Sequence, residues 1–67
     1  MLYEVELLKY KTFKYCNFYF NTFDDALTKY NKLIKKYKTK RVKVSLNVIS
    51  IENKTIKNLE RWQNNED

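Results

Sequence analysis

The sequence contains no histidine, no glycine and no proline, and Cys16 is its only cysteine. Without histidine, and with a single thiol, the chain cannot build a structural zinc site of Cys and His ligands or an internal disulfide. Without glycine it has no glycine-rich loop to hold a phosphate group. Tight turns that need positive φ must use Asn, Asp or Lys instead. These absences predict a protein that uses no metal or cofactor and is not an enzyme.

Two groups of residues could still suggest catalysis. Cys16 lies in the middle of an aromatic run without a neighbouring base, so we interpret it as a small buried hydrophobic residue. Asp24 and Asp25 are adjacent carboxylates, but they fall in the first turn of a predicted helix, where negative charge stabilises the helix dipole. Neither group therefore predicts a catalytic or metal-binding site.

The 67 residues are enough for one small domain. We expect it to span residues 1–62, with residues 63–67 as a frayed tail. A chain of this size buries only about 60% of the surface that its unfolded form exposes, so its stability is marginal. Six Tyr, four Phe and one Trp can compensate with a dense core. A lone cysteine and the lack of a long apolar segment predict a cytoplasmic protein without a membrane partner.

Residues 22–38 carry the clearest pattern in the chain, an amphipathic helix. Its apolar stripe consists of Phe23, Ala26, Leu27, Tyr30, Leu33, Ile34 and Tyr37. The lysines of this segment fall on the opposite face. Thr22 can cap the helix, and Asp25 follows three residues later as in a weak capping box.

Residues 2–8, 13–20 and 41–49 are typical of strands, because apolar or aromatic side chains alternate with others along them. In the third strand, the residues expected to face the core are Val42, Val44, Leu46 and Val48, and those expected to face solvent are Arg41, Lys43, Ser45 and Asn47. The alternation slips at Val48 and Ile49, which suggests a bulge.

The segment after residue 51 fits two structures. A loop over residues 52–55 can return a short fourth strand over residues 56–60, which we favour, or the same segment can form a short helix. One apolar face on each strand and one stripe on the helix predict an α+β fold, with the helix on one face of an antiparallel sheet of three or four strands. A right-handed connection through the helix places the third strand beside the first, and any fourth strand outside the third.

Positive charge is concentrated between residues 26 and 51, which hold eight Lys or Arg residues and no acid. Clustered cations can neutralise phosphates, which makes nucleic acid a candidate partner. The same lysines can equally form an ordinary solubilising surface. The candidate binding residues in this region are Lys29, Lys32, Lys36, Lys40, Arg41 and Lys43.

Tyr10, Tyr15 and Tyr19 are expected on or near the sheet face that the helix does not cover. Tyrosines on such a face can stack on unpaired bases, or they can lie in an interface with another protein. A third alternative is that the tail, with Trp62, folds across this face. We include the three tyrosines in the candidate binding surface.

The chain resembles the very small accessory proteins that bacteriophages and related mobile elements of AT-rich hosts encode. The resemblance rests on its size, on its Lys-, Asn- and Tyr-rich composition, and on a strand pair followed by FNTFDDALTKYNKLIKKY and RVKVSLNVI. It implies an anti-defence protein, such as an anti-CRISPR protein, that inhibits a host protein or nucleoprotein complex by binding. The alternative is a small basic nucleic-acid-binding protein that uses the Lys-rich helix and the aromatic sheet face.

The predicted strand over residues 13–20 lies at an edge of this sheet. It carries one charged residue, Lys14, among five aromatic residues. Natural edge strands are usually protected by charge, proline or bulges, because their backbone groups can pair with another chain. We therefore expect a homodimer that forms through the N-terminal hairpin.

Overall fold

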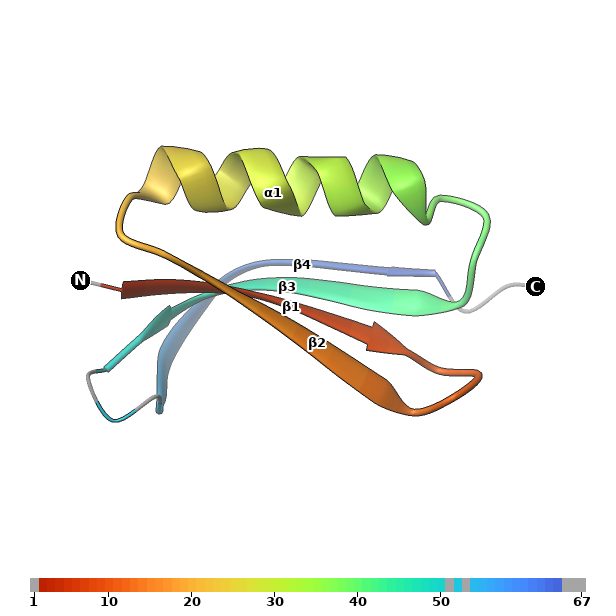
Figure 1. Ribbon diagram of the computed structural model, residues 1–67, viewed down its shortest axis with the longest axis horizontal. Helices are drawn as coiled ribbons and strands as arrows, with labels where there is room; N and C mark the ends of the chain where they lie inside the picture. The colour runs from red at the N-terminus through yellow and green to blue at the C-terminus, as the bar shows by residue number, and fades with distance from the viewer. Residues whose placement is uncertain (1, 51, 53, 65–67) are drawn as a thin grey trace.

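The computed structural model describes residues 2–50, 52 and 54–64. This part of the chain contains β1 (Leu2–Lys9), β2 (Lys14–Phe20), α1 (Phe23–Lys36), β3 (Val42–Ile49) and β4 (Thr55–Asn64). The four strands form one antiparallel sheet, and α1 lies across one of its faces (Figure 1). The predicted α+β fold is confirmed.

The strand order is β2-β1-β3-β4, as the sequence predicts. β1 is an inner strand and pairs antiparallel with both β2 and β3, so those two strands run parallel to each other and α1 connects them. At the end of β1, Lys9 lies opposite Lys14 on one side and Val42 on the other. The β1–β2 turn and the α1–β3 connection therefore lie at the same end of the sheet.

α1 begins where the sequence places its cap. The Thr22 side chain accepts a hydrogen bond from the backbone N–H of Asp25 (3.3 Å), which satisfies one of the donors that a helix N-terminus leaves unpaired. Two aspartates lie in the first turn and two lysines in the last, which is the arrangement that the helix dipole favours. The helix ends at Lys36, two residues before the predicted boundary, and the N–H of Tyr37 donates to the carbonyl of Leu33 (2.9 Å).

The hydrophobic core lies between α1 and the sheet. Its buried members are Val5, Leu7, Ala26, Tyr30, Leu33, Val42, Val44 and Leu46. The helix stripe and the core face of the third strand are therefore confirmed at these positions. Phe23 lies at the rim of the core, 39% exposed, with its ring in an edge-on contact with Tyr3 at 5.9 Å between centroids.

Ser45 and Asn47 depart from their predicted exposure. Alternation directs both away from α1, as expected, yet they are only 6% and 7% exposed. β3 is an inner strand, so side chains of β1 and β4 flank its short polar residues on both sides. The prediction that these residues face solvent is therefore wrong, although the face on which they lie is right.

β4 contains two bulges. Its register against β3 shifts between Leu46 and Asn47 and again between Val48 and Ile49. The sequence predicts an irregularity at the second of these places, and the structure has one there. At each of the two shifts the extra residue belongs to β4, while the pairing of β3 with β1 continues unbroken. The ambiguous tail is therefore a strand, and it extends through Asn64, two residues beyond the expected end of the domain.

The position of Trp62 settles which face β4 helps to cover. Trp62 lies opposite Val44 and packs against the core on the α1 side of the sheet. The hypothesis that Trp62 folds across the other face is therefore wrong.

Asn64 anchors the end of β4, because its side-chain amide donates a hydrogen bond to the carbonyl of Lys38 (2.9 Å). Residues 65–67 of the expected frayed tail lie outside the described residues.

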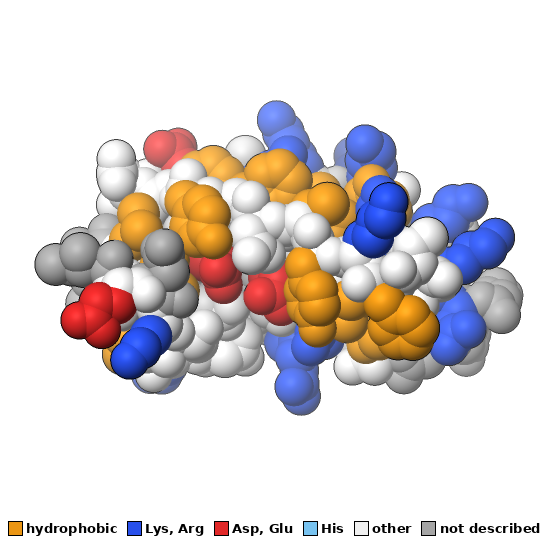
Figure 2. Space-filling model, turned by 60° about the horizontal axis from the view of Figure 1, so that its bottom comes forward, with side chains coloured by type: hydrophobic (Ala, Val, Ile, Leu, Met, Phe, Trp, Pro, Cys, Tyr) orange, Lys and Arg blue, Asp and Glu red, His pale blue; other side chains and the backbone are white. Residues whose placement is uncertain are grey.

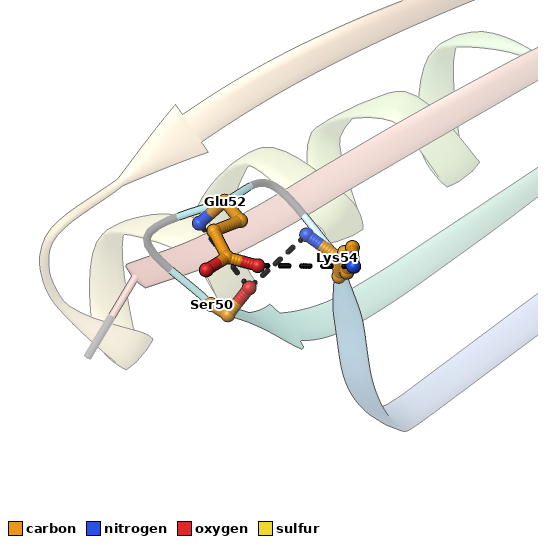
Figure 3. Close-up of polar contacts among 3 residues, drawn as sticks. All are labelled: Ser50, Glu52 and Lys54. Carbon is orange, nitrogen blue, oxygen red and sulfur yellow. Dashed lines mark hydrogen bonds and ion pairs between the residues drawn. The ribbon is translucent and has the colours of Figure 1, made fainter.

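Ser50 organises the loop between β3 and β4, as Figure 3 shows. Its hydroxyl oxygen accepts hydrogen bonds from the backbone N–H groups of Glu52 (3.3 Å) and Lys54 (3.2 Å). Its own N–H donates to the carbonyl of Lys54 (2.9 Å), and the Lys54 ammonium lies 3.8 Å from the Glu52 carboxylate. A serine side chain thus satisfies the backbone of a hairpin loop in a chain that lacks glycine and proline.

Residues 10–13 form the turn between β1 and β2, and Phe13 adopts a positive φ of 52°. The expectation that Asn, Asp or Lys occupies such a position is wrong here. Positive φ is unfavourable for a bulky side chain, because Cβ crowds the backbone. Phe13 nevertheless points largely into solvent, with 78% of its surface exposed, and β2 begins at the next residue.

Candidate functional site

The sheet face that α1 leaves uncovered is the first candidate surface, and we call it the open face. Residues paired across strands share a face, so the register defines its three central rows. The rows are Tyr19, Glu4, Asn47 and Asn58; Asn17, Glu6, Ser45 and Arg61; and Tyr15, Leu8, Lys43 and Gln63. The members on the edge strands β2 and β4 are exposed, whereas those on β1 and β3 are buried or half-buried.

A chain of hydrogen bonds crosses the middle of the open face. The amide nitrogen of Asn47 donates to Oε1 of Glu4 (3.2 Å), and the amide nitrogen of Asn58 donates to Oδ1 of Asn47 (2.8 Å). Asn58 also donates to the carbonyls of Leu46 (3.4 Å) and Glu60 (3.0 Å). These bonds join β1, β3 and β4 and provide polar partners for Glu4, which is only 6% exposed.

Glu6 is the second carboxylate at the centre of this face. Burial is the main cause that raises its pKa above the ordinary value, and the negative charge of Glu4 raises it further. Lys43, on the neighbouring strand, lowers the pKa of Glu6. Figure 2 shows acidic side chains near the middle of this side of the molecule, with hydrophobic side chains around them.

The open face carries two carboxylates and two cations. The carboxylates are those of Glu4 and Glu6, and the cations are Lys43 and Arg61. Their formal charges cancel, so the face does not present the positive field that attracts phosphates. The exposed rings of Tyr15 (59%) and Tyr19 (48%) stand on β2 at its rim.

The predicted lysines of the helix lie on the other side of the sheet. Lys32 and Lys36 are exposed, and the ammonium of Lys36 lies 5.4 Å from the ring centroid of Tyr37. Lys29 is half-buried, with its ammonium 4.2 Å from the ring centroid of Phe18 on β2. The Lys-rich helix and the Tyr-bearing face are therefore separated by the sheet and do not form one continuous binding surface.

A second candidate surface is a cleft of about 670 Å³ at the end of the molecule where the β1–β2 turn meets the α1–β3 connection. We call it the basic cleft. It is lined by Lys9, Lys11, Thr12, Tyr37, Thr39, Lys40, Arg41 and Val42. Lys40 and Arg41 are predicted candidates, and Tyr10 lies beside them, because its N–H donates to the carbonyl of Arg41 (3.1 Å).

The other six residues that line the basic cleft are not among the predicted binding residues, and three of them, Lys9, Lys11 and Tyr37, are cationic or aromatic. Lys9 falls at the end of the first strand, Lys11 in the turn and Tyr37 on the helix stripe, so no local pattern marks them as a group. The predicted strand order is the information from which this group of residues could have been identified. It places the turn over residues 9–12 beside the connection over residues 38–40, which brings the two sets of cations to one end of the sheet.

Cys16 is half-buried and packs against the core cluster. Within residues 2–50, 52 and 54–64, no three His, Cys, Asp or Glu side chains are grouped so that they could hold a metal ion. In the same part of the chain, no helix combines the length and the apolar character needed to cross a membrane.

Comparison of the chain with protein-family models, with curated proteins and with solved structures found no match. Its function is therefore inferred from the open face and the basic cleft.

Proposed function

We propose that this chain is a non-catalytic binding module that docks onto a partner protein through the open face. The observation that carries the proposal is the pair of exposed rings, Tyr15 and Tyr19, beside a centre that is fixed by hydrogen bonds and neutral in formal charge. Tyrosine and arginine are enriched at protein interfaces, and a tyrosine ring provides much contact area at a small cost in side-chain entropy.

The composition of the open face favours a protein over a nucleic acid as its occupant. Two carboxylates at the centre would repel a phosphate backbone, while the two nearby cations only balance them. The amide of Asn17 and the guanidinium of Arg61, both on exposed residues of this face, can instead make directional hydrogen bonds with the backbone and side chains of a protein.

The class of partner follows from the resemblance to small phage accessory proteins. Such a protein acts in stoichiometric amounts and inhibits a host defence protein or nucleoprotein complex by occupying a surface that the complex needs. Neither a cofactor nor a catalytic residue is required for that role. An anti-CRISPR-like inhibitor that acts in the bacterial cytoplasm is the form of the proposal that we favour.

The test is a capture experiment with two matched variants. The tagged protein is used to isolate partners from bacterial lysates, and the captured complex is then purified and titrated. We expect the double variant Tyr15→Ala/Tyr19→Ala to weaken binding at least about tenfold, since a few residues, often tyrosines, carry most of the affinity of a protein interface. We expect Lys32→Ala/Lys35→Ala, on the exposed side of α1, to leave binding unchanged.

An inhibition assay distinguishes a functional target from a protein that binds without any effect on its activity. The captured complex should lose its activity when it is saturated with the wild-type protein, and should retain it with the Tyr15→Ala/Tyr19→Ala variant. Equal binding of both variants to the partner, with circular dichroism showing both folded, would contradict the proposed docking face.

The second candidate function is nucleic-acid binding, the alternative that the sequence leaves open. In its predicted form, such a protein uses the Lys-rich helix and the aromatic sheet face, which lie on opposite sides of the sheet. The basic cleft is the observation that favours it.

A further inference from the structure

The basic cleft has a charge composition that sets it apart from the open face. Four of its eight lining residues are cations, Lys9, Lys11, Lys40 and Arg41, and no Asp or Glu is among the described residues that line it. Two of the cations come from the β1–β2 turn region and two from the α1–β3 connection. A concave surface with cations on both walls concentrates positive potential between them, more than the same lysines would on a convex helix face.

Contacts within the protein hold both walls of the cleft in place. The N–H of Tyr10 donates to the carbonyl of Arg41 (3.1 Å), and the N–H of Lys40 donates to the carbonyl of Tyr37 (3.0 Å). The ammonium of Lys9 lies 5.4 Å from the ring centroid of Tyr37, within the range of a cation–π contact. The turn, the connection and the end of α1 are therefore joined, and the cations are brought together before any ligand arrives.

Phe13 is an aromatic residue in the same turn as Lys11 and Thr12, which line the cleft. It is 78% exposed in a backbone conformation that is unfavourable for an aromatic residue. Single-strand-binding proteins combine a basic groove, which follows the phosphates, with aromatic rings that stack on the bases.

We propose that the basic cleft binds the sugar-phosphate backbone of single-stranded nucleic acid. Lys9, Lys11, Lys40 and Arg41 contact phosphates, and Phe13 stacks on an unpaired base. A cleft of about 670 Å³ is within the size range of small-ligand sites, so it can accept a short stretch of a single strand. A duplex would need a wider basic surface. A membrane surface fits less well, because it is flat and the cations line a concave cleft.

This inference does not depend on the proposed protein partner, because it concerns a different surface. A module with both surfaces could engage a nucleoprotein complex twice, with the open face on the protein and the basic cleft on an exposed strand. Linked contacts of this kind increase the overall affinity without a new contact at either surface.

The experiment measures fluorescence anisotropy of a labelled single strand of about 12 nucleotides, within the usual footprint of single-strand-binding sites. The titration is repeated at several salt concentrations. Lys11→Gln/Lys40→Gln removes two charges from the cleft, and the matched control Lys32→Gln/Lys35→Gln removes two from α1. Circular dichroism and thermal melting establish that both variants fold.

We expect the wild-type protein to bind with a steep salt dependence. The cleft variant should lose about tenfold or more in affinity and reduce the slope of log K against log salt by about 1.4, which corresponds to two phosphate contacts on a single strand. The α1 control should change both quantities much less. Phe13→Ala should weaken binding while leaving the salt slope unchanged, because stacking releases no counterions.

Three outcomes would overturn the proposal. The first is an equal loss in the cleft variant and the α1 control, which would indicate attraction by net charge alone. The second is tighter binding to a duplex of the same sequence, or to vesicles that contain an anionic phospholipid, than to the single strand. The third is no binding of the single strand at low salt. Each of these leaves the proposed protein-binding role of the open face unaffected.

Discussion

Glu4, Asn47 and Asn58 show how single side chains determine the character of the open face. Alternation places Glu4 on this face, where a carboxylate would ordinarily be solvated, but it is only 6% exposed and accepts a hydrogen bond from Asn47. A carboxylate in that position needs a donor, because burying an unpaired charge is costly. Asn47 supplies the donor and is itself oriented by the hydrogen bond from Asn58.

Replacing Asn47 tests this chain of hydrogen bonds. Asn47→Ala removes the donor to Glu4 and the acceptor for Asn58, and we expect it to lower the free energy of unfolding by about 1–3 kcal/mol, the usual cost of leaving a buried polar group unsatisfied. Asn17→Ala, at an exposed position on the same face, is the control and should change little. Urea denaturation measures both, and equal effects of the two substitutions would show that the hydrogen bonds contribute no stability.

Glu6 provides a pH-dependent prediction. Its pKa is raised by burial first and by Glu4 second, so ionisation at neutral pH destabilises the folded protein relative to the unfolded one. The penalty is absent below the ordinary value of 4.5, where both states are protonated, and it develops as the pH rises through the folded-state pKa.

We therefore expect Glu6→Gln to raise the melting temperature at neutral pH and to leave it unchanged well below pH 4.5. The gain should correspond to less than about 1 kcal/mol, because solvent screens a partly exposed charge. Thermal melts of both proteins across this pH range provide the measurement. A difference that does not vary with pH would show that the charge of Glu6 is not its cause.

At the scale of elements, α1 is the part of the fold that local sequence determines most directly. Its cap, its charge distribution and its apolar stripe all agree, and the structure confirms the stripe at Ala26, Tyr30 and Leu33. Leu33→Asp would bury an unpaired carboxylate in the core, so we expect it to unfold the domain. Lys32→Asp, one residue away on the exposed side, should leave the far-ultraviolet circular dichroism spectrum unchanged. The opposite result would mean that the helix is rotated relative to the core.

Some features of the strands can be predicted from the sequence, and others depend on long-range pairing between strands. The strand order follows from strand–helix–strand connectivity, and alternation assigns Val42 and Val44 to the core. The contact between Glu4 and Asn47 joins residues 43 positions apart and requires the correct register of β1 and β3, which no turn signal fixes. The positive φ of Phe13 likewise follows from how the two paired strands meet, since residue preference alone would place another side chain there.

The residues of the basic cleft can be predicted from the sequence only in part. Lys40 and Arg41 are recognisable as part of a cationic segment, whereas Lys9 and Lys11 belong to a segment whose net charge is close to zero. Only the fold brings them together, because β1 ends where β3 begins. Candidate sites of this kind become visible when a predicted topology is used to place turns as well as strands.

At the scale of the whole molecule, the two edges of the sheet differ in how they are protected. β4 has two bulges against β3 and carries charged residues of both signs. β2 pairs with β1 in unbroken register and has Lys14 as its one charged residue. Bulges and charges obstruct pairing with another chain, so β2 is the edge on which a second chain can add.

We expect two copies to associate through their β2 edges about a twofold axis, against a net charge of +6 that opposes association at low salt. Light scattering should then give a mass near twice 8.3 kDa at high concentration, and the dimer should form more readily as salt screens the charge.

Asn17→Lys places a cation in the middle of the β2 edge and should restore the monomer. Ile56→Lys makes a comparable change on β4 and should not. Because β2 also carries Tyr15 and Tyr19, a bound partner protein should compete with self-association. A mass of 8.3 kDa for the wild-type protein at every concentration and salt level would contradict this arrangement.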